Sequence, residues 1–412
     1  MFSLASRLGA RLLFAEHRYY GRSLPFGAAS FTPTNLSLLS IEQALADYAA
    51  LLVALPNELG CHSARRSGSG RTLCDVVLFG GSYGGMLAAW HRVRFPQLTL
   101  GAVASGAPVD FYPGEGIQRA FAAAVNATYA TYGRAGCASM LGAALASAET
   151  ATEGQLAMAG VRPCAPMGAD APSRYAFYAR GAIASLAMLD YPYATEFVGV
   201  LPANPVQRAC VDLMAGTGGL LPKLHAAVLH FVNATGTLRC IDLQAELVGV
   251  DRHLRPRRGV DYREVAGDLG VRSWNYQACT ELPLEPITSD GLGFYPEQSG
   301  KQLAELETNC AKRFSVRPRP GWMGLAFGLG ADYRHHSNIL FIENEKDPWH
   351  VGTASVPAVT GIGGTVRRHL ARGGAHHQDL RFASPLDAQG VLEARRLVES
   401  TVRGWLQGGG ES

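Results

Sequence analysis

The sequence predicts an α/β protein in which a parallel sheet is divided by a long, mostly helical insertion. Short apolar runs that end at small or polar residues occur before residue 110 and again after residue 337, and helical patterns follow them. Such alternation is typical of parallel strands joined by crossover helices. Between the two groups lie Ala-rich helical segments separated by Pro-rich breaks. With 412 residues, 47% of them hydrophobic, the chain can bury one large core, or one core and an inserted domain.

Residues 1–115 are expected to form the first part of the sheet domain. A short helix over Leu4–Leu8 is expected to lead into a strand over Ala10–Ala15. Ser40 is a cap-like residue before an amphipathic helix that packs on the sheet. The other expected elements are a strand at Val76–Phe79, a helix at Met86–Arg94 and a small-residue strand at Leu100–Val109.

A Gly-x-Ser-x-Gly motif, centred on Ser82, joins the strand at Val76–Phe79 to the helix that follows. A serine on so sharp a turn takes a strained backbone conformation, and Gly80 and Gly84 let neighbouring chain segments approach it closely. An ordinary Gly/Ser turn would contain the same residue types, so the motif alone does not decide. In its context of strand, turn and helix, Ser82 is the candidate nucleophile.

Candidate partners for Ser82 lie near the end of the chain. A serine needs a positioned base, and that base needs an acid to orient it. Asp347 follows a buried strand at Asn338–Ile342, and His376 and His377 follow a second expected strand. Serine, acid and histidine in this order are typical of α/β-hydrolases. Taken alone, Asp347 would be interpreted as a solvated carboxylate and the histidines as a surface pair. The combination favours a triad, but the spacing does not choose between the two histidines.

Residues 116–330 are expected to form an inserted helical cap, and residues 331–412 to complete the sheet domain. The separation of Ser82 from Asp347 far exceeds what the strands and helices of a hydrolase sheet need. A cap inserted here lies over the edge of the sheet that carries the triad, which favours short peptides or chain ends as substrates. Its expected helices are Ile117–Tyr132, Gly136–Leu156, Tyr175–Asp190 and Leu221–Val232.

The eight cysteines predict disulfides rather than a metal site. There is no CxxC pair and no Cys/His cluster at ligand spacing, so neither a metal nor another cofactor is expected. Cys61 and Cys74 flank a Gly/Ser/Arg-rich loop and are either a disulfide or two unrelated thiols. Glycosylation sequons begin at Asn35, Asn126 and Asn233. These features favour an oxidising, glycosylating compartment. The six cysteines in or beside the cap are Cys137, Cys164, Cys210, Cys240, Cys279 and Cys310.

Charge and hydropathy exclude two classes of function. A net charge of +3 on 412 residues is too small to indicate the basic surface that binds nucleic acid. The sequence contains no apolar run of about 18 residues, so a membrane span is not expected. The apolar run within Met1–Ala15 is too short for a signal peptide and has no polar cleavage region after it.

Four motifs resemble the serine peptidase family of prolylcarboxypeptidase, lysosomal dipeptidyl peptidase II and thymus-specific serine protease. They run in register from about Leu12 to a C-terminal helix near Trp405. The motifs are F-A-E-H-R-Y-Y-G-R-S-L-P-F-G from Phe14 together with the elbow, W-N-Y-Q-A-C-T-E from Trp274, D-P-W from Asp347, and G-A-H-H from Gly374.

The resemblance implies a serine exopeptidase with Ser82 as nucleophile, Asp347 as acid and His376 as base. The backbone N–H of Tyr83 would be one donor to the oxyanion. Members of the family act next to proline, releasing either a C-terminal residue or an N-terminal dipeptide. A pocket for proline is expected to be lined by Met86 and Trp349, although both residues also suit ordinary core packing.

The resemblance further implies peptide substrates with proline near a terminus and a lysosomal, vacuolar or secreted location. It leaves homodimerisation open. Two departures from the family are notable. Glu343 and Asn344 stand where the family has Asn-Gly, which brings a second carboxylate near Asp347. By the resemblance, we expect the chain to begin after the family's signal sequence, earlier strands and Gly-rich loop, the last of which is expected to supply the second oxyanion donor. The alternative is therefore a truncated, inactive homologue that binds peptides or partners; an esterase or lipase fits the motifs less well.

Overall fold

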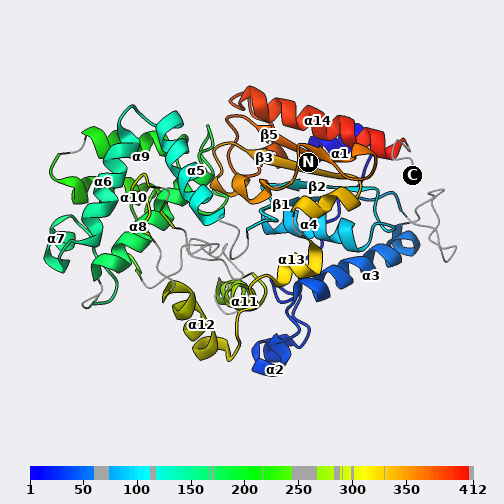
Figure 1. Ribbon diagram of the computed structural model, residues 1–412, viewed down its shortest axis with the longest axis horizontal. Helices are drawn as coiled ribbons and strands as arrows, with labels where there is room; N and C mark the ends of the chain where they lie inside the picture. The colour runs from blue at the N-terminus through cyan, green and yellow to red at the C-terminus, as the bar shows by residue number, and fades with distance from the viewer. Residues whose placement is uncertain are drawn as a thin grey trace.

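The computed structural model describes most of the chain, in which four parallel strands and one antiparallel strand form a single sheet (Figure 1). Cys61 lies outside the described residues, so the proposed pairing with Cys74 lies outside them too. The residues described are 1–59, 74–111, 117–166, 168, 171–215, 217–243, 267–282, 288–289, 291–297, 301–328 and 330–407.

The order of the sheet brings four strand ends to one edge. Strands β1 (Val77–Gly81), β2 (Gly101–Ser105), β3 (Ile339–Asn344) and β5 (Val366–Ala371) pair in parallel in that order, and β4 (Val359–Thr360) pairs antiparallel with β5. All residues of β2 and β3 are buried, as expected for central strands covered on both faces. The predicted α/β-hydrolase fold is confirmed, and the predicted strands before and after the insertion lie side by side.

Helices cover both faces of the sheet. On one face, α4 (Tyr83–Arg94), α3 (Ile41–Leu59) and α13 (Trp322–Phe327) enclose an apolar cluster in which Trp90 stacks on Phe327 at 4.9 Å between ring centroids. On the other face, α14 (Gln389–Leu406) and α1 (Phe2–Leu8) pack over β2, β3 and β5 (Figure 1). The predicted helix at Leu4–Leu8 is thus confirmed.

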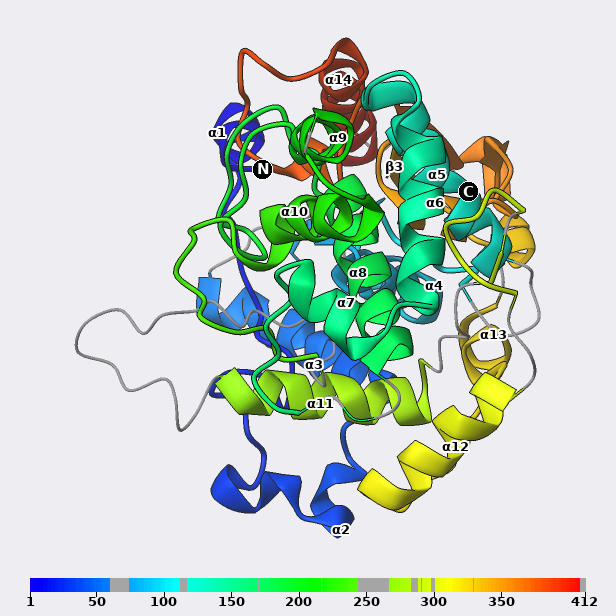
Figure 2. The same ribbon diagram turned by 90° about the vertical axis from the view of Figure 1, so that its left-hand side faces the viewer.

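The helices α5 to α10 form a group of their own beside the sheet (Figures 1 and 2). They share one apolar cluster, which supports our proposal of an inserted helical cap at residues 116–330. The predicted helix at Gly136–Leu156 is two helices, because Thr152 forms a capping box with Gln155 and starts a new one. The helices are α5 (Ile117–Tyr132), α6 (Cys137–Glu149), α7 (Glu153–Met158), α8 (Ala171–Met188), α9 (Pro205–Ala215) and α10 (Leu220–Val232).

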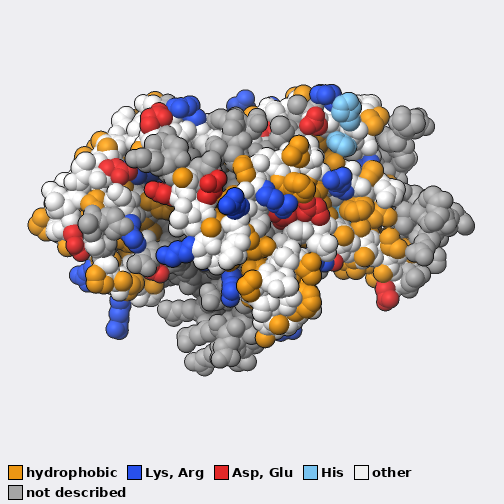
Figure 3. Space-filling model, turned by 60° about the horizontal axis from the view of Figure 1, so that its bottom comes forward, with side chains coloured by type: hydrophobic (Ala, Val, Ile, Leu, Met, Phe, Trp, Pro, Cys, Tyr) orange, Lys and Arg blue, Asp and Glu red, His pale blue; other side chains and the backbone are white. Residues whose placement is uncertain are grey.

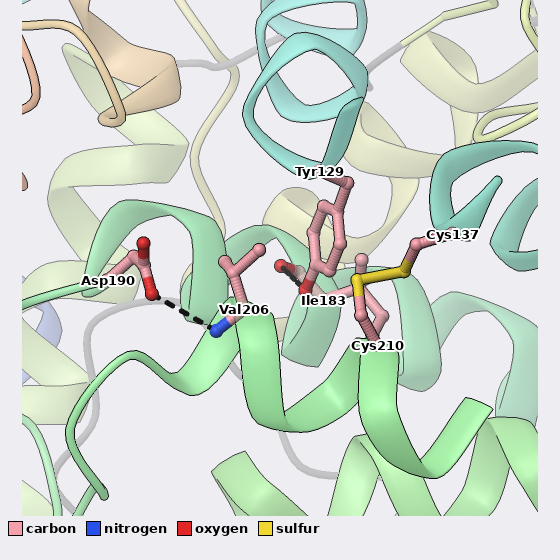
Figure 4. The surroundings of a disulfide bond; sticks show 6 residues. All are labelled: Tyr129, Cys137, Ile183, Asp190, Val206 and Cys210. Carbon is pink, nitrogen blue, oxygen red and sulfur yellow. Dashed lines mark hydrogen bonds between the residues drawn. A yellow bond between two sulfur atoms is a disulfide. The ribbon is translucent and has the colours of Figure 1, made fainter. Parts of the chain in front are cut away.

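Three disulfides fasten this half of the chain. Cys137 and Cys210 join α6 to α9, beside Tyr129 (Figure 4). Cys164 is bonded to Cys240, and Cys279 to Cys310. The last bond joins α11 (Gly267–Thr280) to α12 (Lys301–Phe314), which lie across the lower part of Figure 2. The short helix α2 (Pro33–Leu36) lies at the bottom of the same view.

The predicted strand at Ala10–Ala15 is wrong. These residues have no regular secondary structure, and Leu13 and Phe14 are 56% and 67% exposed. A strand persists only where its backbone groups pair with a neighbouring strand, and no described strand pairs with this segment. The apolar residues of this segment therefore did not predict whether its backbone pairs with a neighbouring strand.

The surface carries both signs of charge. On the face shown in Figure 3, basic and acidic side chains are interspersed rather than gathered by sign, in keeping with the small net charge. Within the described ranges, no helix is both long and apolar enough to span a bilayer. The same ranges contain no group of three potential metal-binding side chains.

Candidate active site

Ser82 occupies a sharp turn between β1 and α4. Its φ of 56° and ψ of −127° lie in a region that side-chain-bearing residues rarely adopt. The turn is held by a hydrogen bond from the Ser82 N–H to the Ser105 carbonyl, at 2.9 Å. A Cβ on Gly80 would lie 1.9 Å from the Gly84 carbonyl oxygen, so only glycine fits there. The structure thus gives a physical reason for the first glycine of the motif. The close approach predicted at Gly84 is wrong, because a Cβ there would meet nothing within 4 Å.

Asp347 and His376 are hydrogen-bonded to each other at the same edge of the sheet. Asp347 follows β3 and precedes the 3-10 helix Pro348–Thr353, and His376 follows β5. The His376 Nδ1 donates to Asp347 Oδ2 at 2.5 Å, and the two side chains are 4% and 0% exposed. The other carboxylate oxygen accepts from the Trp349 N–H at 3.1 Å. With its Nδ1 proton held by the acid, His376 has its Nε2 free to accept a proton.

The elbow and the acid–histidine pair meet around the end of β2. Gly106, directly after Ser105, has φ +54°, and a Cβ there would lie 3.1 Å from both Asp347 Oδ2 and His376 Nδ1. Because Ser105 also accepts the Ser82 N–H, this short segment touches both parts of the site. The structure therefore brings the three sequence-predicted residues to one edge of the sheet.

The two adjacent histidines have different surroundings. His376 contacts the acid, whereas the ring of His377 lies over the elbow, with its Cδ2 2.9 Å from the point where a Gly81 Cβ would lie. His377 also packs edge-on against Phe197, which lies between α8 and α9, at 5.1 Å between centroids. Burial lowers the pKa of His377 well below its usual value, and the neighbouring His376 lowers it further. This geometry supports His376 as the base, a choice that the spacing left open.

The helical group holds the histidine loop from outside the sheet. The His376 N–H donates to the Met188 carbonyl at 2.9 Å, and the Tyr191 hydroxyl donates to the His376 carbonyl at 2.7 Å. One residue before the acid, the Lys346 ammonium donates to the carboxylate of Asp190 at 2.9 Å, and this pair is almost fully buried. Sequence reasoning missed these contacts, since they join residues more than 150 positions apart.

The second carboxylate near Asp347 is buried in β3. The pKa of Glu343 is raised to about 8, chiefly by burial; Arg368, 3.8 Å away, opposes the rise, and Asp347 and Asp110 contribute to it. Under acidic conditions Glu343 therefore holds its proton and does not add a second negative charge beside Asp347.

The residue after Glu343 supports the histidine loop. The Asn344 amide donates to Asp379 Oδ1 at 3.2 Å, and the Ser105 hydroxyl donates to the same oxygen at 2.5 Å. Burial raises the pKa of Asp379, and these two hydrogen bonds oppose the rise. This departure from the family's motif thus connects β2, β3 and the loop that carries His376.

The two predicted pocket residues pack in different apolar clusters. Trp349 lies between Phe111 and Phe121, with both centroids 4.8 Å away, and faces the helical group. Met86 is buried in the cluster between the sheet and α3. Their common role in a proline pocket remains a prediction.

The three sequon asparagines are all partly exposed. Asn126 lies on α5, and Asn233 caps the end of α10, where its Oδ1 accepts the Leu238 N–H at 2.9 Å. The Asn35 amide donates to the Ala29 carbonyl at 3.0 Å. Their accessibility is compatible with glycosylation, which stays a prediction.

Comparisons with known proteins extend over nearly the whole chain. The family model described as "Serine carboxypeptidase S28" matches residues 1–398. The human "Lysosomal Pro-X carboxypeptidase" is 32% identical over an alignment that covers 99% of this chain and 77% of that protein. The Caenorhabditis elegans "Prolyl carboxy peptidase like protein 5" is 30% identical, with coverage of 99% and 79%. The human "Thymus-specific serine protease" is 28% identical, with coverage of 98% and 76%.

Proposed function

Since the chain belongs to the S28 serine carboxypeptidase family and is a serine peptidase, we propose that it is an exopeptidase that cleaves next to proline with a triad of Ser82, Asp347 and His376. The observation that carries this proposal is the 2.5 Å hydrogen bond between the acid and the histidine, at the sheet edge where the strained serine lies. These are the groups that acyl transfer requires in the order that α/β-hydrolases use.

The proposed reaction passes through an acyl-enzyme. The Ser82 Oγ attacks the carbonyl carbon of the scissile bond while His376 Nε2 accepts the hydroxyl proton. The carbonyl oxygen becomes an oxyanion, which the backbone N–H of Tyr83 stabilises. As the C–N bond breaks, the imidazolium returns its proton to the leaving amine. Water, activated by the same imidazole, then attacks the ester and releases Ser82. Asp347 accepts the hydrogen bond from His376 Nδ1 and orients the ring.

The relatives support the substrate class and the direction of cleavage that we propose. The human relative is named a Pro-X carboxypeptidase, which favours release of a C-terminal residue that follows proline. The helical group that contacts the His376 loop supports a restricted entrance suited to chain ends. We also propose a lysosomal or secreted location, because relatives from three mammals carry "lysosomal" in their names.

The proposed function is tested by labelling and turnover in parallel. The full chain, expressed in an oxidising host, is treated with a fluorophosphonate beside Ser82→Ala, His376→Ala and, as a control, His335→Ala, which changes an exposed histidine. We expect labelling of wild type and the control only. Turnover is measured at pH 5 on peptides ending in Pro-Phe, on matched Ala-Phe peptides, and on dipeptidyl amides.

The outcomes separate the alternatives. Preference for Pro-Phe supports the carboxypeptidase direction, and preference for the amide of a Pro-ending dipeptide supports the other direction. Labelling that survives Ser82→Ala would refute the triad. Folded wild-type protein that neither labels nor turns over any peptide would favour the inactive, peptide-binding homologue.

A further inference from the structure

The side chain of Tyr83 takes part in a hydrogen-bonded chain that no step of the proposed reaction uses. Its hydroxyl lies 2.9 Å from the Gln277 amide nitrogen and 3.1 Å from His17 Nε2. Beyond it, the Tyr20 hydroxyl donates to Gln277 Oε1 at 2.5 Å. The members come from the N-terminal segment, the start of α4, and α11, so the chain joins three distant parts of the sequence.

The direction of every hydrogen bond in this chain follows from its two ends. His17 Nδ1 is 2.7 Å from the Arg18 carbonyl, which can only accept, so Nδ1 carries the proton and Nε2 accepts from Tyr83. The Tyr83 oxygen must then accept from the amide nitrogen of Gln277, which leaves Gln277 Oε1 to accept from Tyr20. Burial lowers the pKa of His17 and raises that of Tyr83, which keeps both groups neutral. A single placement of the protons therefore satisfies all of these hydrogen bonds.

Aromatic contacts hold the Tyr83 ring as well as its hydroxyl. Trp274, one turn before Gln277 on α11, lies edge-on to the Tyr83 ring at 5.6 Å between centroids. The His17 ring lies 5.7 Å from the same ring and packs edge-on against Tyr20 at 5.0 Å. A ring fixed by two hydrogen bonds and two aromatic neighbours leaves its own Cα little freedom to rotate.

Tyr83 is also the residue whose backbone N–H faces the developing oxyanion in the proposed reaction. We propose that His17 and Gln277 are positioning residues, which hold Tyr83 through its hydroxyl and thereby aim its backbone N–H at the oxyanion. This inference rests on the proposed function. An oxyanion donor acts only when it is already in place, and a displacement of about 1 Å at a reacting centre can cost about a hundredfold in rate.

The kinetic test removes the hydroxyl and compares transition-state with ground-state binding. Tyr83→Phe and Gln277→Leu are measured beside Tyr48→Phe as the matched control. Tyr48 lies on α3, its ring centroid is 6.4 Å from that of His17, and the substitution removes the same hydroxyl group. Two ligands are compared. A peptide aldehyde forms a hemiacetal when Ser82 Oγ bonds to its carbonyl carbon, which leaves an oxyanion at the donor. The product peptide forms no such bond.

We expect kcat to fall about tenfold to a hundredfold in Tyr83→Phe and in Gln277→Leu, with KM within twofold of wild type. Affinity for the aldehyde should fall in parallel, while affinity for the product and all constants of Tyr48→Phe stay unchanged. Wild-type kcat in both variants would overturn the inference. So would equal losses of aldehyde and product affinity, because that pattern indicates a generally damaged pocket.

A second readout does not depend on turnover. Amide hydrogen exchange of the peptide spanning residues 78–90 is compared in Tyr83→Phe and Tyr48→Phe, both first shown to unfold cooperatively. We expect faster exchange at the elbow in Tyr83→Phe alone, and equal exchange in the two variants would overturn the positioning role. If wild type shows no turnover, the proposed function fails, while the exchange result still decides whether the hydroxyl fixes the elbow backbone.

Discussion

Replacement of Glu343 by glutamine should change how the stability of the fold depends on pH. The side chain is 4% exposed, and burial raises the pKa of Glu343 from 4.5 to about 8. Between these two pH values the folded chain holds a proton that the unfolded chain has released. The contribution of Glu343 to the free energy of unfolding is therefore fully present below about pH 4.5 and is lost as the pH rises towards 8.

The magnitude follows from the size of this pKa change. At about 1.36 kcal/mol per pKa unit, ionising Glu343 in the folded protein costs on the order of 5 kcal/mol. Glutamine has nearly the same shape and never ionises. The difference in unfolding free energy between Glu343→Gln and wild type should thus shift in favour of the variant by a few kcal/mol between pH 4.5 and pH 8.

The assay is equilibrium urea unfolding followed by tryptophan fluorescence at several pH values, with reversibility checked by dilution. Glu305→Gln, which changes an exposed glutamate on α12, serves as the matched control and should keep the wild-type pH dependence. If Glu343→Gln also kept the wild-type slope, Glu343 would be ionised in the folded protein and the electrostatic interpretation of β3 would be wrong.

Three further predictions concern other parts of the structure. Gly106→Ala should lower the single-turnover rate about tenfold or more, since its Cβ would lie 3.1 Å from both atoms of the acid–histidine bond; an unchanged rate would mean that the pair can shift without cost. Lys346→Met should lower urea stability by about 3 kcal/mol or more by leaving buried Asp190 unpaired, and Asp190→Leu in the same chain should recover part of it. No recovery would contradict the pairing. Glu281→Gln should make the free energy of unfolding depend less on pH between 4.5 and 8, because burial raises the pKa of Glu281 to about 8. Urea unfolding at several pH values measures this dependence, and an unaltered slope would contradict the prediction.

The sequence was sufficient for those features that a local pattern encodes. The elbow at Ser82 needs glycine for contacts within a few residues, and the strand before Asp347 is apolar throughout because both faces of the sheet are covered. The segment at Ala10–Ala15 shows the limit of such patterns. Apolar residues predict a strand only if a partner strand is present, and pairing is a property of the whole sheet.

The choice between His376 and His377 shows the same limit at the site. Both follow β5 and have the same side chain, so only the directions of their rings distinguish them. The ring of His376 contacts Asp347, whereas the ring of His377 lies over Gly81. The hydrogen bonds from Gln277 to Tyr83 and from Lys346 to Asp190 were equally out of reach, since each joins residues more than 150 positions apart.

The raised pKa of Glu343 also bears on how the site can keep a second carboxyl group beside its acid. If Glu343 were ionised, its charge would add to that of Asp347 and favour the protonated imidazole, which cannot act as a base. While Glu343 holds its proton, it adds no charge beside the hydrogen bond between Asp347 and His376. Acidic conditions therefore favour the protonated form of Glu343, in which it adds no charge beside Asp347. We accordingly expect kcat of Glu343→Gln to match that of wild type at pH 5, and a large loss there would mean that the carboxyl group itself serves the reaction.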